Sequence, residues 1–259
     1  MITLICGTVF AAAILAGGVA PIHPEPLAGP FPIVELRQYT LHDGKRDTLI
    51  DLFERNFVES QEALGMKVIG TFRDLDRPNR FVWIRGFTGM DARLAGLSSF
   101  YGGPVWQAHR NEANATMIDS DNVFLLHAPA GGAAFKPEPP RPALGEKRQA
   151  HLIVATIYYL KGDTAAAATL FKQRVIARLR TSGVAPLAWF ITETAANNYP
   201  RLPVREGERV MVSFARFESE ADLKAHKPAL DEAATAFGPK LTREPEVLRL
   251  EPTDRSELR

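Results

Sequence analysis

The chain has 259 residues, of which 46% are hydrophobic and 24% charged, and its formal net charge is +1. These values are typical of an ordinary globular protein of one or two domains. The near-zero net charge gives no electrostatic attraction to nucleic acid or to an anionic membrane. The single cysteine, Cys6, excludes an internal disulfide framework and a cysteine-based zinc site.

The first 32 residues differ in composition from the rest of the chain. Residues 1–20 are almost wholly apolar and end in Gly-Val-Ala, as a signal peptide does before its cleavage site, which would mean export. Against this, no Lys or Arg precedes the apolar run, and Pro21 would follow the cut. The alternative is a misassigned start of translation and a cytoplasmic protein. The run is also short and rich in glycine for a helix that spans a bilayer.

The next hundred residues predict one compact unit. Residues 34–40 alternate between apolar and polar, as in a strand covered on one face. Within residues 49–64, apolar residues recur at helical spacing. Strands are expected at residues 67–73 and 80–87, helices at 91–97 and 104–115, and a final strand at 123–127. The resulting order, β-α-β-β-α-β, is that of a ferredoxin-like domain.

The same pattern returns later in the chain. Gly44 and Gly65 correspond to Gly162 and Gly183 at one offset (162 − 44 = 118 and 183 − 65 = 118), which indicates an internal duplication. In the second half we expect strands at residues 152–160, 186–193, 208–217 and 247–251, and helices at 163–181 and 220–237, the latter interrupted near Pro228. The loop at residues 194–207 is about twelve residues longer than its counterpart in the first half (130 − 118 = 12). It is interpreted either as a lid over a site or as a plain surface insertion.

These observations predict the organisation of the whole chain. They divide it into a leader (residues 1–32), a ferredoxin-like domain (33–128), a Pro/Gly-rich linker (129–148), a second and degenerate ferredoxin-like domain (149–252) and a polar tail (253–259). A four-stranded sheet with helices on one face must cover its other face. We therefore predict an α+β fold in which the two repeats face each other and form a dimeric α+β barrel within one chain.

Polar side chains in the first strand suggest where function could lie. At the offset of 118, three of them align with apolar residues of the second half: Glu35, Arg37 and Tyr39 with Ile153, Ala155 and Ile157. Val34 and Leu36 are then expected under the helices, with the polar column inside the barrel.

Trp83 and Arg85 are expected beside that polar column. One interpretation is a pocket for an aromatic or anionic small molecule. The other is a closed network of buried ion pairs that fixes the strand register. The residues alone leave both open.

His109 is the most informative histidine. It follows Trp106 by three residues, so both share a helical face, near Tyr101. It is either a general base or a half-exposed helix residue beside core aromatics. The predicted catalytic residues are His109 and Tyr39, and the predicted ligand-binding residues are Glu35, Arg37, Trp83, Arg85, Tyr101 and Trp106. No metal site is predicted, because no pair of histidines has the spacing of metal ligands.

Several short motifs of the first half occur in the same order as in a known domain family. They are Val34-Glu35-Leu36-Arg37-Gln38-Tyr39, Gly44, Gly65, Val68-Ile69-Gly70, Asn79-Arg80-Phe81-Val82-Trp83 and Pro104-Val105-Trp106. Together they resemble the NIPSNAP domain, a member of the dimeric α+β barrel superfamily, over about residues 33–126. The family usually has an Asp just before the Pro-x-Trp segment, where this chain has Gly103. A role carried by that carboxylate is therefore not transferred.

The resemblance implies a fold more firmly than a reaction. Superfamily relatives include cofactor-free monooxygenases, haem-binding enzymes and small-molecule lyases or isomerases, whereas some NIPSNAP domains are implicated in protein interactions. We expect a small aromatic or anionic ligand, handled by a cofactor-independent oxygenase- or isomerase-like protein. Haem, with His109 as its ligand as in some superfamily relatives, is a distant alternative. The competing hypothesis is a non-catalytic interaction or scaffold module. We expect no nucleic-acid partner, and a homo-oligomer, if one forms, would use the outer surfaces.

Overall fold

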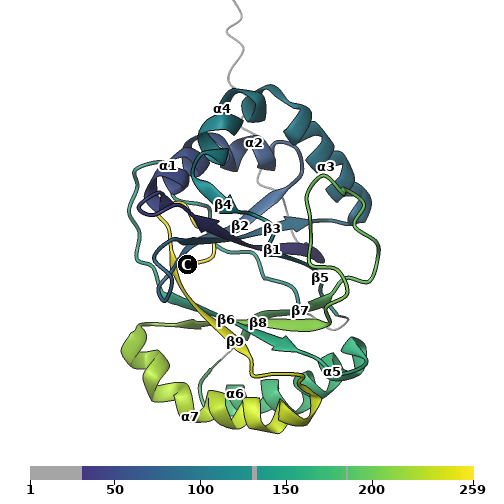
Figure 1. The fold of residues 1–259 in the computed structure, drawn as a ribbon. Coiled ribbons are helices and arrows are strands. Elements are labelled where there is room, and N and C mark those ends of the chain that lie inside the picture. Colours follow the sequence, from purple (N-terminus) through teal and green to yellow (C-terminus); the bar gives the residue numbers. More distant parts are fainter. Residues whose placement is uncertain (1–30, 130–132, 185) are drawn as a thin grey trace, which may run out of the picture.

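The computed structural model describes residues 31–129, 133–184 and 186–259, so the leader hypothesis, at residues 1–30, lies outside the described part. Two layers of strands face each other in the middle of the molecule, and helices cover the two outer sides (Figure 1). Each layer comes from one half of the chain. Among the described residues, no helix combines the length and apolar character needed to span a membrane.

The first half contains the predicted ferredoxin-like order. Its strands are β1 (Ile33–Leu41), β2 (Lys67–Asp74), β3 (Arg80–Phe87), β4 (Met117–Asp119) and β5 (Val123–His127), and its helices are α1 (Arg46–Asn56), α2 (Val58–Glu62), α3 (Met90–Gly102) and α4 (Pro104–Asn114). Two details differ from the prediction. The expected helix at residues 49–64 is divided at Phe57, and the short strand β4 was not predicted.

The second half repeats this order. Its strands are β6 (Leu152–Tyr159), β7 (Pro186–Thr192), β8 (Val210–Phe217) and β9 (Glu246–Pro252), and its helical segments are α5 (Thr164–Leu170), the π-helical η1 (Phe171–Ile176), α6 (Ala177–Thr181), α7 (Glu220–Phe237) and the short η2 (Gly238–Lys240). The expected interruption of the last long helix is wrong, because α7 runs through Pro228. The side chain of Ser219 caps the N-terminus of α7 by accepting a hydrogen bond from the Asp222 amide.

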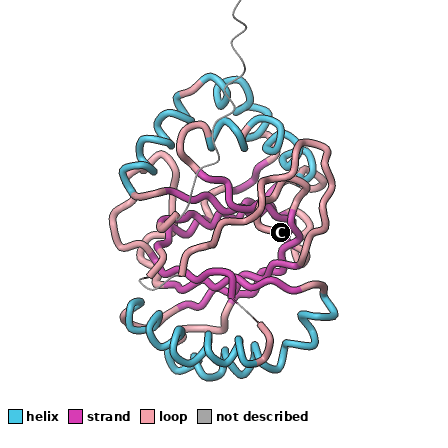
Figure 2. The backbone as a smooth tube through the Cα atoms, turned by 180° about the vertical axis from the view of Figure 1, so that it is seen from behind, coloured by secondary structure: helices cyan, strands magenta, loops and turns pink. Residues whose placement is uncertain are grey.

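The two four-stranded sheets close into one eight-stranded antiparallel barrel, as predicted. Within the halves the strand orders are β5-β1-β3-β2 and β9-β6-β8-β7, and β4 extends the end of β1. The seams between the halves are β2 with β9 and β5 with β7. Figure 2 shows the two layers from behind, with helices only on the outer sides. Barrel closure leaves no open sheet edge between the two halves.

The barrel interior is filled by side chains from both halves. Its core is apolar and includes Val34, Leu36, Ile84, Phe124, Phe190, Phe214 and Leu250. Each half has one further apolar cluster, which lies between its sheet and its helices. The candidate polar residues belong to one of these outer layers, so the site must be sought outside the barrel.

The prediction of which face of β1 lines the barrel is therefore wrong. Val34 and Leu36 point inward, and Glu35 and Arg37 lie under the helices. The turn glycines do match at 118, and all four adopt left-handed φ values, between 70° at Gly44 and 88° at Gly183. The equivalent strands, however, are offset by 119 residues. Ile33 pairs with Phe87 and Leu152 pairs with Phe217, the equivalent phenylalanine of the second half (152 − 33 = 119).

The first half has one additional residue between β1 and Gly44. It lies where the pairing of β1 with β4 shifts register after Thr40. A shift of one residue moves every side chain of a strand to its opposite face. The aligned positions are thus Glu35 with Val154, Arg37 with Thr156 and Tyr39 with Tyr158 (each 119 apart).

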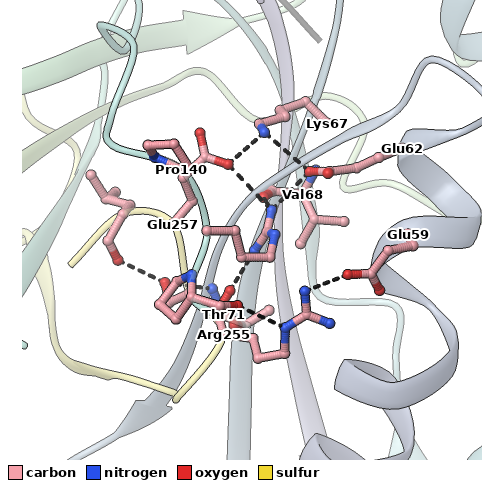
Figure 3. A network of polar contacts seen from close by, with 12 residues as sticks. Glu59, Glu62, Lys67, Val68, Thr71, Pro140, Arg255 and Glu257 are labelled. Carbon is pink, nitrogen blue, oxygen red and sulfur yellow. Dashed lines mark hydrogen bonds and ion pairs between the residues drawn. The ribbon is translucent and has the colours of Figure 1, made fainter. Parts of the chain in front are cut away.

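Residues 253–259 return from the second half and pack on the first. Leu258 is 1% exposed and belongs to the barrel core, and Thr253 Oγ1 shares a 2.6 Å hydrogen bond with Thr71 Oγ1 of β2. Arg255 donates 3.1 Å hydrogen bonds to the carbonyl oxygens of Glu54 and Pro142, and forms an ion pair with Glu59 on α2 (Figure 3). The segment thereby connects both halves and the linker.

Candidate functional site

A small cavity lies between the outer face of the first sheet and its helices. It has a volume of about 40 Å³. Its walls are mainly aromatic and come from β1, β3, α1, α2, α3, α4 and β4: Tyr39, Leu49, Phe53, Phe57, Gln61, Trp83, Phe100, Tyr101, Trp106, Ala113 and Met117. Four of the predicted site residues therefore meet here, namely Tyr39, Trp83, Tyr101 and Trp106.

A buried cluster of charges lies beside this cavity. One carboxylate oxygen of Glu35 forms ion pairs with Arg37 Nη1 at 2.8 Å and Arg85 Nη2 at 2.6 Å. The other oxygen forms an ion pair with Arg93 Nε at 2.8 Å. Each of the four side chains is at most 1% exposed. Arg85 also donates to Gln61 Oε1 at 2.8 Å, which connects the cluster to a cavity wall.

The charge cluster keeps Glu35 ionised. Burial acts to raise the pKa of its carboxyl group, but the guanidinium groups of Arg85, Arg37 and Arg93 outweigh burial and hold that pKa well below its usual range. One carboxylate thus neutralises part of a triple positive charge. The remaining charge is stabilised by aromatic faces: Arg85 lies 5.0 Å and Arg37 5.6 Å from the ring centroid of Trp83.

Two polar groups of the cavity wall are positioned by this cluster. Arg37 Nε donates a 2.9 Å hydrogen bond to the phenol oxygen of Tyr39, and burial raises the pKa of that phenol, so it stays neutral. The Tyr39 hydroxyl proton is therefore available to another acceptor. Trp83 Nε1 is buried and has no hydrogen-bond partner among the described residues. A buried donor without a partner is unusual and costs free energy.

The long loop between β7 and β8, residues 193–209, covers this region from the other half. Figure 1 shows it in green, rising from the lower sheet to lie beside α3. Tyr199 stacks on Tyr101 with ring centroids 6.0 Å apart, and Arg93 Nη1 donates to Asn198 Oδ1 at 2.6 Å and to Asn197 Oδ1 at 3.1 Å. The loop is therefore attached both to an aromatic cavity wall and to the charge cluster.

The structure does not place His109 at the cavity. Its side chain is one-third exposed and packs edge-on against Phe57, with ring centroids 6.2 Å apart. It faces a separate surface hollow beside Asp47, Asp51 and Arg55 on α1. The cavity also has no room for a haem. Among the described residues, no group of three or more His, Cys, Asp or Glu side chains is arranged to hold a metal ion.

Several residues of the site carry no obvious sequence signal. Gln61 and the two asparagines of the 193–209 loop come from distant segments, and only the tertiary fold brings them to the cluster. Arg93 did have a signal. It precedes Leu97 and Phe100 by four and seven residues, so it belongs to the apolar stripe of α3, and a charge on such a stripe needs a buried partner.

With this geometry in place, comparison with known proteins identifies part of the chain. Residues 34–130 match the NIPSNAP family model. This segment is a NIPSNAP domain. It contains β1 to β5, the cavity wall and the complete Glu35 cluster, and the second half of the chain supplies the loop that covers it. No protein of curated function matches the sequence.

Solved structures extend the likeness to both halves. A candidate monooxygenase from Fusobacterium nucleatum is 11% identical, with a TM-score of 0.58, and the match covers 86% of this chain and 92% of that one. A candidate monooxygenase from Lactobacillus acidophilus is 15% identical, with a TM-score of 0.55 and coverages of 86% and 94%. An anthrone oxidase-like protein is 12% identical, with a TM-score of 0.55 and coverages of 86% and 92%. At these identities the likeness shows a shared fold. The NIPSNAP domain and its partner half thus form the two units of one barrel.

Proposed function

We propose that the protein binds a small aromatic molecule with a hydrogen-bond acceptor in the cavity of the NIPSNAP domain. The observation that carries the proposal is the buried indole N–H of Trp83, which lacks a partner among the described residues, in a cavity walled by aromatic rings. A ligand oxygen would satisfy that donor, and the neutral phenol of Tyr39 supplies a second one. Aromatic ligands also gain from edge-on and stacked contacts with such walls.

Binding of an aromatic ring requires the cavity to enlarge. A volume of about 40 Å³ holds only a few water molecules. The covering loop is the element best suited to move, because Tyr199 already occupies a stacking position on Tyr101 that a ligand ring could take over. In this proposal the 193–209 loop acts as a lid, and the Glu35 cluster positions Tyr39 and Trp83 without touching the ligand.

The proposal includes turnover of the ligand by an oxygenase- or isomerase-like reaction that uses no bound cofactor. Its support is the fold shared with the candidate monooxygenases and the anthrone oxidase-like protein, together with a cavity walled mainly by aromatic side chains. Oxygen uptake in the presence of a phenolic compound separates the two reaction types, because an isomerisation consumes no oxygen.

Binding is tested with 1-naphthol as the probe, by titration calorimetry on the full chain. Trp83→Phe removes the indole donor and Tyr39→Phe removes the phenol, and each should weaken binding about tenfold, the equivalent of one hydrogen bond. Trp189→Phe, at a buried tryptophan of the second half, is the matched control and should leave affinity unchanged. No saturable binding at millimolar probe would instead favour the scaffold hypothesis, as would binding that neither site variant changes.

A further inference from the structure

One pair of equivalent valines differs in exposure between the two halves. Val123 of β5 faces Arg37 across the strand pair, and Val247 of β9 faces Thr156, the residue 119 positions after Arg37. Val123 is fully buried, whereas Val247 is 47% exposed. The same position of the fold is therefore covered in one half and open in the other.

The cause is the length of the opposing hairpin. In the first half the 193–209 loop lies over β5: the Arg205 amide donates to the Val123 carbonyl at 2.8 Å, and Tyr199, Leu202 and Val204 pack on the outer core. In the second half the corresponding connection, residues 75–79, is short. It reaches β9 through the Leu75 amide and Asp76, which contact Arg249, and through an ion pair of Arg77 with Glu246. None of its residues lines the space over Val247.

The uncovered space is a groove of about 700 Å³ between α7 and the strands β6 and β9. Its floor is apolar and is formed mainly by Val154, Tyr158, Leu223, Leu230, Pro245 and Val247. A volume of this size is in the range of small-molecule sites. In the first half, aromatic and aliphatic side chains of the protein itself fill the equivalent space. The groove should therefore bind an apolar group.

The charges around the groove are mostly paired. Arg249 binds Glu220 and Asp76, and Lys227 binds Asp231 at 2.6 Å. Lys224, one turn before Lys227 on the groove side of α7, forms no ion pair with the described residues. Its ammonium group can therefore receive an anion at the rim while an apolar body lies on the floor. Glu244, on the side of the groove next to Pro245, would repel an anion placed there.

We propose that this groove is a second binding site, for an elongated amphipathic carboxylate whose aliphatic part covers Val247 and whose carboxylate pairs with Lys224. The site is independent of the first-half cavity, since no residue lines both. Tyr158, the counterpart of Tyr39, forms part of the floor.

Three probes of equal chain length test the assignment by calorimetry, below their micellar concentrations: decanoate, decanol and decylamine. Decanoate should bind at least about tenfold more tightly than decylamine, with decanol between them. Lys224→Gln should reduce decanoate affinity to that of decanol and leave decanol unchanged. Equal or tighter binding of decylamine would overturn the carboxylate assignment, and absence of saturable binding by all three would overturn the site.

Two variants test the location. Val247→Trp fills the groove from the strand side and Ala221→Trp from the exposed helix side, and each should weaken decanoate binding at least about tenfold. Ile118→Trp is the matched control, because Ile118 is 62% exposed on β4 of the other half. Thermal melts monitor folding of each variant. Binding that neither groove-filling variant weakens would place the ligand elsewhere. Trp83→Phe, expected to weaken 1-naphthol binding about tenfold, should leave decanoate binding intact.

Discussion

Glu35 lies 2.6 Å from Arg85 Nη2, and neither side chain is exposed to solvent. The same carboxylate also contacts Arg37 and Arg93, so one anion holds three buried cations together between sheet and helices. Breaking a buried ion pair is far more costly than breaking a surface pair, because the remaining charge stays buried without its partner. The energetic importance of the four residues is therefore unequal.

The first prediction concerns the shared anion. Glu35→Gln should lower the free energy of unfolding by about 3–5 kcal/mol, because three guanidinium groups lose their counter-charge. Urea denaturation measures the effect. Asp51→Asn removes the carboxylate of an exposed helix pair with Arg55 and should cost less than about 1 kcal/mol. Equal losses in the two variants would contradict the importance assigned to the cluster.

The second prediction distinguishes a structural role of Arg37 from a role in ligand binding. Arg37→Met leaves Glu35 paired with Arg85 and Arg93, so its stability loss should be smaller than that of Glu35→Gln. It removes the hydrogen bond to the Tyr39 phenol, and 1-naphthol affinity should fall by about tenfold. A stability loss of about 3–5 kcal/mol with unchanged affinity would show that Arg37 is purely structural.

The third prediction concerns acid. The folded-state pKa of Glu35 lies well below the value of 4.5 expected for an unperturbed carboxyl, so the folded state favours its ionised form. The stabilisation is fully present above about pH 4.5 and is lost as the pH falls from there toward the folded-state pKa. Urea unfolding measured from pH 7 to pH 3 should therefore show a difference between the wild type and Glu35→Gln that shrinks below pH 4.5. A constant difference would contradict this assignment.

The fourth prediction concerns the lid. Asn198→Ala removes one of the two acceptors of Arg93 Nη1 and the donor to the Met90 carbonyl, two of the contacts that attach the 193–209 loop. Amide hydrogen exchange in that loop should become faster, with a stability loss of about 1–3 kcal/mol. Arg201→Ala changes an exposed residue of the same loop and should alter neither. Unchanged exchange in Asn198→Ala would mean that the loop is held by its apolar contacts alone.

The fifth prediction concerns the returning segment. Leu258 is 1% exposed in the barrel core, and Leu258→Ala should lower the free energy of unfolding by about 2–5 kcal/mol. Leu144, in the linker, is 57% exposed, and Leu144→Ala should cost less than about 0.5 kcal/mol. Matching effects of the two substitutions, measured by urea denaturation, would show that residues 253–259 are not part of the folding unit.

Sequence reasoning predicted the order of elements because periodicity and turn glycines are local signals. The barrel followed from the need to cover two bare sheet faces. The orientation of β1 could not be read in the same way, since one additional residue after Thr40 changes the face of every side chain while the glycine spacing stays at 118.

The site was only partly accessible from the sequence. Tyr39, Trp83, Tyr101 and Trp106 could be grouped because aromatic residues recur on neighbouring elements of one repeat. The contacts of Arg93 with Asn197 and Asn198 span more than one hundred residues, and no local pattern signals them. The open groove of the second half depends on the difference in length of two hairpins, whose effect appears only when the halves are placed face to face.

The seam between β2 and β9 also determines how the protein must be made. Phe72 of β2 pairs with Pro252, and β2 ends at Asp74, so it is complete 172 residues before β9 begins at Glu246 (246 − 74 = 172). At usual rates of translation this interval is on the order of ten seconds. Throughout it, the edge of β2 presents unpaired peptide groups that can pair with other chains. Nascent protein therefore needs its greatest protection from aggregation while the second half is still on the ribosome.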